Sequence, residues 1–310
     1  DCDTVVDDGL TTYTWYFDAD LDSFGDSTVS TVSCSVPAGY VTPSHAGDAD
    51  FEVFIEFGPT GIGEMPASSS DLTVTLETDY TDADFRDADG DGADDVLVAG
   101  GWSNSGAGVA YYVEGGSRAF VVNARSSAVA TFAGEASYDH LGDSVALCDL
   151  DDDGHADAIL GAPYADGGAA SSGLVHVFSW SYAGAISASA ADAKLPGTAE
   201  RDNFGMKVEC LGDLDVDGRE EVGITAPYAD SGGLRSGTGY IFFGGLAGTV
   251  AAASADTVVR GDAVDDQLYD VIGLGDVTDD GALDVVFGSS RNDDGGTDGG
   301  AAWIFAGGGL

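Results

Sequence analysis

Four acidic segments of the chain place oxygen-bearing side chains at one short, repeated spacing. Each carries an acid, or in one case a threonine, at positions 1, 3, 5 and 9, with glycine at position 6. Calcium binds about six to eight oxygen atoms, and the glycine permits the sharp bend that brings such ligands together. The pattern predicts calcium (Ca²⁺) ligation by Asp87, Asp89, Asp91 and Asp95; Asp149, Asp151, Asp153 and Asp157; Asp213, Asp215, Asp217 and Glu221; and Asp276, Thr278, Asp280 and Asp284.

Solvated turns are the alternative interpretation of these loops, since Asp and Gly favour turns with or without a metal. Four loops in register favour calcium, because clustered carboxylates repel one another when no cation neutralises them. Magnesium fits less well, because it requires a stricter octahedron and retains water. The last loop is the weakest candidate, since Thr278 offers a neutral oxygen where the other loops offer a carboxylate.

The loops belong to a larger repeat, because the residues that open them, Asp87, Asp149, Asp213 and Asp276, lie 62, 64 and 63 positions apart. After each loop come a short apolar run, a small-residue turn, a Gly-rich stretch and an aromatic run. The aromatic runs are Val109–Val113, Leu174–Phe178, Gly239–Phe243 and Ala302–Phe305. Each unit therefore predicts about four short strands and no helix. Such units cannot bury both faces alone, which favours an all-β β-propeller of radially packed four-stranded blades.

Two further motifs carry a resemblance to a known family. Asp202–Gly205 (DNFG) and Gly161–Pro163 (GAP) resemble the two signatures of the FG-GAP repeat, and Asp139–Gly142 and Asp266–Tyr269 resemble degenerate copies. The resemblance covers residues 51–310. It implies the β-propeller of integrin α subunits and bacterial surface proteins, with calcium loops between the first and second strands of each blade. It also implies a secreted or cell-surface location and a role in adhesion, protein interaction or surface assembly.

The N-terminal segment, residues 1–50, has a different acidic pattern that contains two cysteines. Its residues Asp18, Asp20, Asp22 and Asp26 resemble the metal-binding repeat of bacterial cell-surface proteins, although Ser23 occupies the sixth position. Alternatively, residues 11–78 form a fifth blade, with Phe51–Gly58 as its aromatic strand and Leu72–Glu77 as its fourth. Both interpretations stay open at the level of sequence.

The last unit stops after its third strand, at Phe305, and the N-terminus offers a matching fourth one. Asp3–Val6 and Asp256–Val259 share the sequence DTVV. An unpaired strand edge invites pairing, so we expect Asp3–Val6 to lie beside Ala302–Phe305. Within one chain this closes a five-bladed monomer, and between chains it donates a strand and builds an oligomer or filament. The alternative is that the chain is part of a larger, seven-bladed propeller.

The charge balance limits the partners of the chain. The sequence has 10 Lys and Arg against 55 Asp and Glu, a formal net charge of −45. Without a basic patch, binding to nucleic acid or to anionic lipid is disfavoured, and no apolar run is long enough to span a membrane. Bound divalent cations would relieve the self-repulsion. A halophilic or merely solubilising surface is the alternative.

No catalytic motif is present, and we predict that the chain is not an enzyme. The four histidines, His45, His140, His155 and His176, fall on unrelated positions of the repeat. A glycosidase-like carboxylate pair is the remaining enzymatic alternative. Two non-enzymatic alternatives are a carbohydrate-binding propeller, whose exposed aromatics would be Trp102, Tyr164 and Tyr228, and a metal-sequestering surface protein that uses the N-terminal segment.

The four cysteines divide into two pairs. The extracellular location implied by the resemblance predicts a disulfide between Cys2 and Cys34, which flank the N-terminal acidic motif. Cys148 and Cys210 lie on the first strands of neighbouring units. A second disulfide and a pair of buried thiols are both open for them, because bridged Cα atoms must lie within about 7 Å.

Overall fold

The computed structural model describes residues 81–115, 121–293 and 299–307, and five strands nearer the N-terminus. For those five strands and for residues 121–123 only the backbone is described. The chain forms two compact units, Asp1–Phe51 and Glu52–Leu310. Most of the described structure is β-sheet. Among the described residues, no helix has the length and apolar character needed to cross a membrane.

The first unit contains one small antiparallel sheet. Its strands are β1 (Tyr13–Phe17), β2 (Asp26–Ser33) and β3 (Tyr40–Val41), in the order β2-β1-β3. Asp26 opens β2, whereas Asp18, Asp20 and Asp22 lie outside the described residues, as do Cys2 and Cys34.

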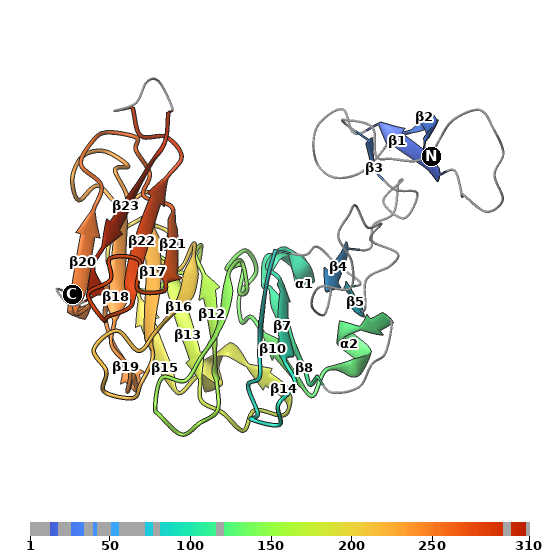
Figure 1. The fold of residues 1–310 in the computed structure, drawn as a ribbon, viewed down its shortest axis with the longest axis horizontal. Coiled ribbons are helices and arrows are strands. Elements are labelled where there is room, and N and C mark those ends of the chain that lie inside the picture. Colours follow the sequence, from blue (N-terminus) through green and yellow to red (C-terminus); the bar gives the residue numbers. More distant parts are fainter. Residues whose placement is uncertain are drawn as a thin grey trace. The chain divides into compact units, whose positions relative to one another are not determined.

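The second unit repeats one antiparallel meander, in which each strand pairs with its neighbour in sequence (Figure 1). The first repeat sheet contains β6 (Asp82–Arg86), β7 (Asp95–Gly100), β8 (Val109–Val113) and β10 (Ala130–Ala133); the second contains β11 (Val145–Cys148), β12 (Asp157–Ala162), β13 (Leu174–Phe178) and β15 (Ala193–Pro196); the third contains β16 (Val208–Gly212), β17 (Glu221–Ala226), β18 (Thr238–Phe242) and β20 (Thr257–Arg260). The fourth contains β21 (Asp270–Leu274), β22 (Asp284–Ser289) and β23 (Ala301–Phe305).

Within the described ranges, the helical elements between strands are single turns. These are α1 (Ser103–Gly106), α2 (Ala124–Ser127) and the 3-10 turns η3 (Ala188–Ala190) and η4 (Ala252–Ser254). α1 is irregular, since Asn104 and Ser105 inside it have left-handed backbone angles. The repeats therefore have the short strands that the sequence predicted, joined by turns.

Consecutive sheets bury the second strand on both faces. Every residue of β7, β12 and β17 is buried, which explains why these strands are continuous apolar runs and do not alternate. Each buried Leu, Ile or Phe side chain contributes roughly 1.5–3 kcal/mol relative to exposure. Among the described residues, four clusters form the core. Three lie between consecutive sheets, with Leu97, Tyr112 and Leu160 in the first; Ile159, Val177 and Ile224 in the second; and Ile241, Val271 and Phe287 in the third. The fourth, with Val96, Val98 and Tyr111, uses other side chains of β7 and β8.

Short parallel strands cover the outer edges of the sheets. β14 (Gly184–Ser187) pairs with β10, and β19 (Gly248–Thr249) pairs with β15, so each repeat adds a strand to the sheet before it. β9 (Val121–Asn123) pairs in the same parallel manner with β5 (Leu72–Leu76), which lies beside β4 (Phe51–Ile55). β5 is therefore paired with a short strand of the first repeat, as β10 and β15 are paired with short strands of the repeats that follow them. By this comparison, β4 and β5 correspond to the last two strands of a repeat.

The prediction of a fifth blade over residues 11–78 finds its last two strands in β4 and β5, which lie side by side, with β5 paired to β9. In the first unit, β1 pairs with β2 and with β3. That residues 11–50 supply the first half of this blade stays a prediction. Asp3–Val6, the predicted closing strand, lies outside the described residues, and within the described chain β23 is the outer strand of the fourth sheet.

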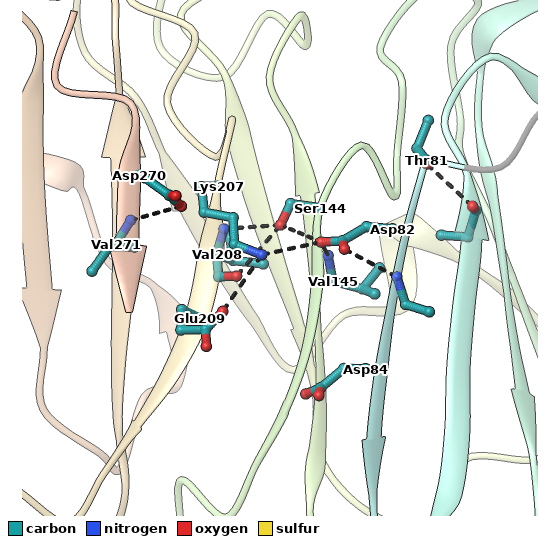
Figure 2. A network of polar contacts seen from close by, with 12 residues as sticks. Thr81, Asp82, Asp84, Ser144, Val145, Lys207, Val208, Glu209, Asp270 and Val271 are labelled. Carbon is teal, nitrogen blue, oxygen red and sulfur yellow. Dashed lines mark hydrogen bonds and ion pairs between the residues drawn. The ribbon is translucent and has the colours of Figure 1, made fainter. Parts of the chain in front are cut away.

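The first strands of consecutive sheets lie side by side and are joined by polar side chains (Figure 2). The Asp82 carboxylate accepts hydrogen bonds from Ser144 Oγ at 2.8 Å and from Val145 N at 3.1 Å. Lys207 Nζ lies 3.4 Å from carboxylate oxygens of both Asp82 and Glu209. The Asp82 carboxylate thus accepts a hydrogen bond from a backbone amide of β11, which is an edge strand of its sheet.

A disulfide crosses the same region. Cys148 on β11 is bonded to Cys210 on β16, with Cα atoms 5.4 Å apart. The structure thus decides between the two alternatives that the sequence left open for these residues. The bond closes a loop over a sequence separation of 62, which in the chain-entropy account stabilises the fold by about 4 kcal/mol.

Candidate metal centre

Each acidic loop connects the first and second strands of its repeat sheet. The loops run from β6 to β7, from β11 to β12, from β16 to β17 and from β21 to β22. The acid at position 9 is in every case the residue that opens the second strand: Asp95, Asp157, Glu221 and Asp284. The framework of the sheets therefore fixes one end of each loop, and the rest of the loop curls back from it.

The curl is held by the first aspartate and the glycine. Asp213 accepts a hydrogen bond from Asp217 N at 3.1 Å and another from Gly218 N at 3.0 Å. The corresponding bond from the glycine amide recurs in the other three loops. The four glycines, Gly92, Gly154, Gly218 and Gly281, have φ values of +91, +85, +99 and +92°, a region where side chains other than glycine are strained.

The acid at position 9 has a structural role that the sequence did not reveal. Its carboxylate accepts a hydrogen bond from the amide at position 2 of the same loop, from Ala88, Leu150, Leu214 and Val277 in turn. It also accepts one from the amide two residues after the third strand, that of Gly115, Trp180 or Gly307, and in the third loop the Gly244 amide likewise hydrogen-bonds to Glu221, against the rise that burial causes in the pKa of that acid. The acid at position 9 therefore connects its loop to the sheet. The sequence signal for this role was the presence of an acid at the first position of each second strand.

Three of the four loops gather their carboxylates around one point. In the third loop one oxygen from each of Asp213, Asp215, Asp217 and Glu221 lies within 4.8 Å of the others. The first loop gathers Asp87, Asp89 and Asp95, and the second gathers Asp149, Asp151 and Asp153. Asp91 and Asp157 do not belong to these groups, and the fourth loop yields no group among the described residues.

The fourth loop differs at position 3, where Thr278 replaces a carboxylate, and its ninth acid is bound on both oxygens. The Asp284 carboxylate accepts hydrogen bonds from the amides of Val277, Thr278 and Gly307 and from Thr278 Oγ1. Burial alone would raise the pKa of Asp284, but these hydrogen bonds outweigh it and lower the pKa below its usual value. Thr278 thus fills a position where the other loops carry a carboxylate, and it also binds the acid opposite.

The gathered carboxylates are incompletely satisfied by the protein. Asp87 Oδ1 and Glu221 Oε1 are buried and have no hydrogen-bond partner. Burial raises the pKa of Glu221 to about 7, against the hydrogen bond from Leu214, and burial also raises the pKa of Asp157 to about 7. Buried oxygens without donors are costly, and a hard cation would satisfy them. The donor set is all oxygen, so the residues of the first three loops fit calcium.

Neighbouring loops are hydrogen-bonded to one another through a residue that sequence reasoning missed. Glu220, at position 8 of the third loop, forms an ion pair with Arg86, at 2.5 and 2.8 Å, and accepts a hydrogen bond from Asp149 N at 2.8 Å. Its own amide donates to Asp149 O at 2.8 Å. The sequence offered one signal for this contact, since Arg86 is one of the few cationic residues in the chain and directly precedes the first loop.

The described histidines make packing contacts, each in a different part of the repeat. His155 stacks on Trp180 with ring centroids 5.1 Å apart, and His140 packs between Trp102 and Tyr164. His176 is buried on β13, and burial lowers its pKa to about 4, so its ring is neutral at physiological pH. His45 lies outside the described residues.

Comparisons with known proteins identify the repeat. Residues 141–178, which contain β11 to β13 and the second acidic loop, match the FG-GAP repeat. Integrin alpha-5 of Xenopus laevis is 35% identical over 118 residues, or 36% of this chain and 11% of that protein. Integrin alpha-IIb of Homo sapiens is 35% identical over 105 residues, or 32% and 10%. Integrin alpha-3 of Mus musculus is 30% identical over 142 residues, or 42% and 13%.

This chain spans only about a tenth of the length of the integrin subunits that it matches. The FG-GAP repeat is a propeller-blade repeat of a non-catalytic family, and the match falls on a sheet with the meander and acidic loop described above. The resemblance predicted from the DNFG and GAP motifs is thus confirmed: the chain contains an FG-GAP repeat and is integrin-α-like over about a third of its length.

Proposed function

We propose that the chain is a calcium-stabilised β-propeller, or part of one, that acts outside the cell in adhesion or protein interaction and performs no catalysis. The four meander sheets, packed first strand to first strand, support the propeller. The similarity to integrin α subunits supports a role in recognition. The acidic loops supply structural cation sites, placed at the end of the sheets where the first strand turns into the second.

The observation that carries this proposal is the third loop. Four carboxylates gather there, and the buried oxygen of Glu221 points to a missing positive charge. Extracellular calcium modules bind at roughly 0.1–1 mM. At about 1 mM calcium a 0.1 mM site stabilises the folded state by about 1.4 kcal/mol, so three such sites contribute about 4 kcal/mol. That is a large part of the stability of an ordinary domain.

Secretion or surface display follows from the same proposal. The Cys148–Cys210 disulfide is the kind of bond that persists in oxidising compartments. Millimolar calcium is available outside cells, where sites of this modest affinity would be filled.

Thermal unfolding with and without calcium tests the proposal. We expect removal of calcium by a chelator to lower the melting temperature by roughly 10 °C, from about 4 kcal/mol lost and the usual conversion for a domain of this size. Magnesium added after chelation should restore the melting temperature poorly, because it needs a stricter octahedron. Superimposable melting curves with and without chelator would contradict the proposal.

Closure of the propeller is a separate part of the proposal. β23 is the outer strand of the fourth sheet in the described chain, and we propose that Asp3–Val6 pairs with it, within one chain or from a second copy. Deleting residues 1–9 should destabilise a closed monomer without changing its size, and should dissociate a strand-exchanged assembly. A deletion that changes neither melting nor size would rule this pairing out.

A further inference from the structure

A cleft of about 610 Å³ opens between the second and third repeat sheets, at the strand ends opposite the acidic loops. Tyr164 and Tyr228 line it from the turns that follow β12 and β17. Arg201, Asp202 and Asn203 line it from the connection that leads to β16, and Arg235 lines it from the turn before β18. Both turns and connections recur in the neighbouring repeats, so the cleft can be compared with its equivalents.

Three backbone hydrogen bonds show which residues are equivalent. His140 N donates to Gly106 O, Asn203 N donates to Ser171 O, and Gln267 N donates to Arg235 O. The three junctions between consecutive sheets are therefore built alike in their backbones. Tyr164 and Tyr228 correspond to Trp102 of the first repeat, since each follows the second strand of its sheet.

At the other two junctions, side chains contact one another across the junction. At the first junction His140 packs against Trp102, with ring centroids 4.2 Å apart. At the third junction Arg235 forms an ion pair with Asp265 at 2.6 Å. At the second junction Asn203 stands in the place of His140 and donates to Pro163 O at 2.9 Å, and Ser171 stands in the place of Gly106 and Arg235. The cleft lies at this second junction.

The walls of the cleft combine aromatic rings with paired charges. Tyr164 is 38% exposed and Tyr228 is half-buried. Arg201 lies 3.6 Å from a Glu200 carboxylate oxygen, and the Arg235 guanidinium is held by Asp265. Because the cations on the walls already have acidic partners, the cleft does not require a charged ligand. The formal net charge of −45 also disfavours an anionic one.

We propose that this cleft binds a neutral oligosaccharide, with Tyr164 and Tyr228 stacking on sugar rings and Arg201 and Asp202 hydrogen-bonding to hydroxyl groups. Tyr offers an apolar ring face together with a polar edge. Sugar hydroxyls both donate and accept hydrogen bonds, so they match a wall that carries guanidinium donors beside carboxylate acceptors. The volume lies within the usual range of ligand pockets, roughly 300–1,000 Å³.

This inference rests on the proposed function in one respect, namely that the chain acts in recognition. It does not depend on how tightly the acidic loops bind calcium. The test is binding of the calcium-loaded full chain to an array of immobilised neutral, sialylated and sulfated oligosaccharides. We expect binding to neutral oligosaccharides, weakened at least about tenfold by Tyr164→Ala and by Tyr228→Ala, a change of about 1.4 kcal/mol. Tyr164→Phe should retain most of the binding, since it keeps the ring.

Tyr138→Ala is the matched control. Tyr138 is a 71% exposed tyrosine at the first junction and does not line the cleft, so its loss should leave binding unchanged. Melting curves with calcium and with chelator check that each variant folds, and they report on the calcium proposal separately. Absence of binding to every neutral oligosaccharide, preference for sialylated or sulfated ones, or equal loss in Tyr138→Ala would overturn the inference.

Discussion

The third and fourth acidic loops have the same length and the same place between first and second strands, yet they present different chemistry. The third gathers four carboxylates within 4.8 Å, and one buried oxygen of Glu221 lacks a partner. In the fourth, Asp284 is bound by backbone amides and by Thr278 Oγ1. One loop therefore gathers four carboxylates that a cation could bridge, whereas the other forms no such group among the described residues.

The difference teaches that spacing alone does not define a cation site. Asp276 and Asp280 of the fourth loop keep the Asx-type hydrogen bonds of the other loops, with Asp280 N and Gly281 N donating to Asp276. The curl of the backbone is thus preserved without the converging charge. The difference lies at position 3, where Thr278 replaces a carboxylate that each of the other three loops contributes to its group.

The largest effect is expected from Asp217→Ala. Asp217 supplies a carboxylate to the third cluster and is exposed, so its loss should weaken calcium binding there without disturbing the core. We expect the affinity of that loop to fall at least about tenfold, or about 1.4 kcal/mol. Isothermal titration of calcium into the variant and the parent measures the change, and an unchanged isotherm would remove the third loop from the set of sites.

Thr278→Asp should make calcium binding by the fourth loop more like that of the third. The change removes a hydroxyl that donates to Asp284 and adds a carboxylate at position 3. Affinity in such loops rises with the number of charged ligands, so the variant should bind one more calcium ion per chain than the parent at about 1 mM free calcium. Native mass spectrometry counts the bound ions. An unchanged count would show that the fourth loop is limited by its backbone rather than by residue 278.

The smallest effect is expected from Asp279→Asn. Asp279 occupies position 4, is exposed, and has a φ of +59°, a conformation that Asn tolerates as well as Asp does. The variant removes a negative charge beside the loop without removing a predicted ligand. Calcium affinity and melting temperature should stay close to those of the parent. A loss as large as that of Asp217→Ala would mean that net charge, and not ligand position, governs binding.

The sequence predicted the repeated parts of this molecule well. Periodic apolar and aromatic runs located the strands, and Thr278 marked the fourth loop as the weakest. The structural role of the ninth acid was not predictable, because its donors Gly115, Trp180 and Gly307 lie about twenty residues further along the chain. The Cys148–Cys210 bond was left open for the same reason, since it depends on which first strands are neighbours.

The sequence located β4 and β5, the last two strands of the predicted fifth blade, by their residue patterns. Such patterns do not determine which strands pair, so the first half of that blade stays a prediction. The cleft between the second and third sheets was also beyond sequence reasoning. Its walls come from turns and connections of two different repeats, and which residues correspond between junctions becomes visible only from the backbone.

The most direct test of the account is an anomalous-difference map from crystals grown in calcium. Such a map locates each ion by loop. The account predicts strong peaks inside the first three loops, with the third peak surrounded by Asp213, Asp215, Asp217 and Glu221, and at most a weak peak in the fourth. Absence of any peak in the first three loops, or a dominant peak in the fourth, would contradict it.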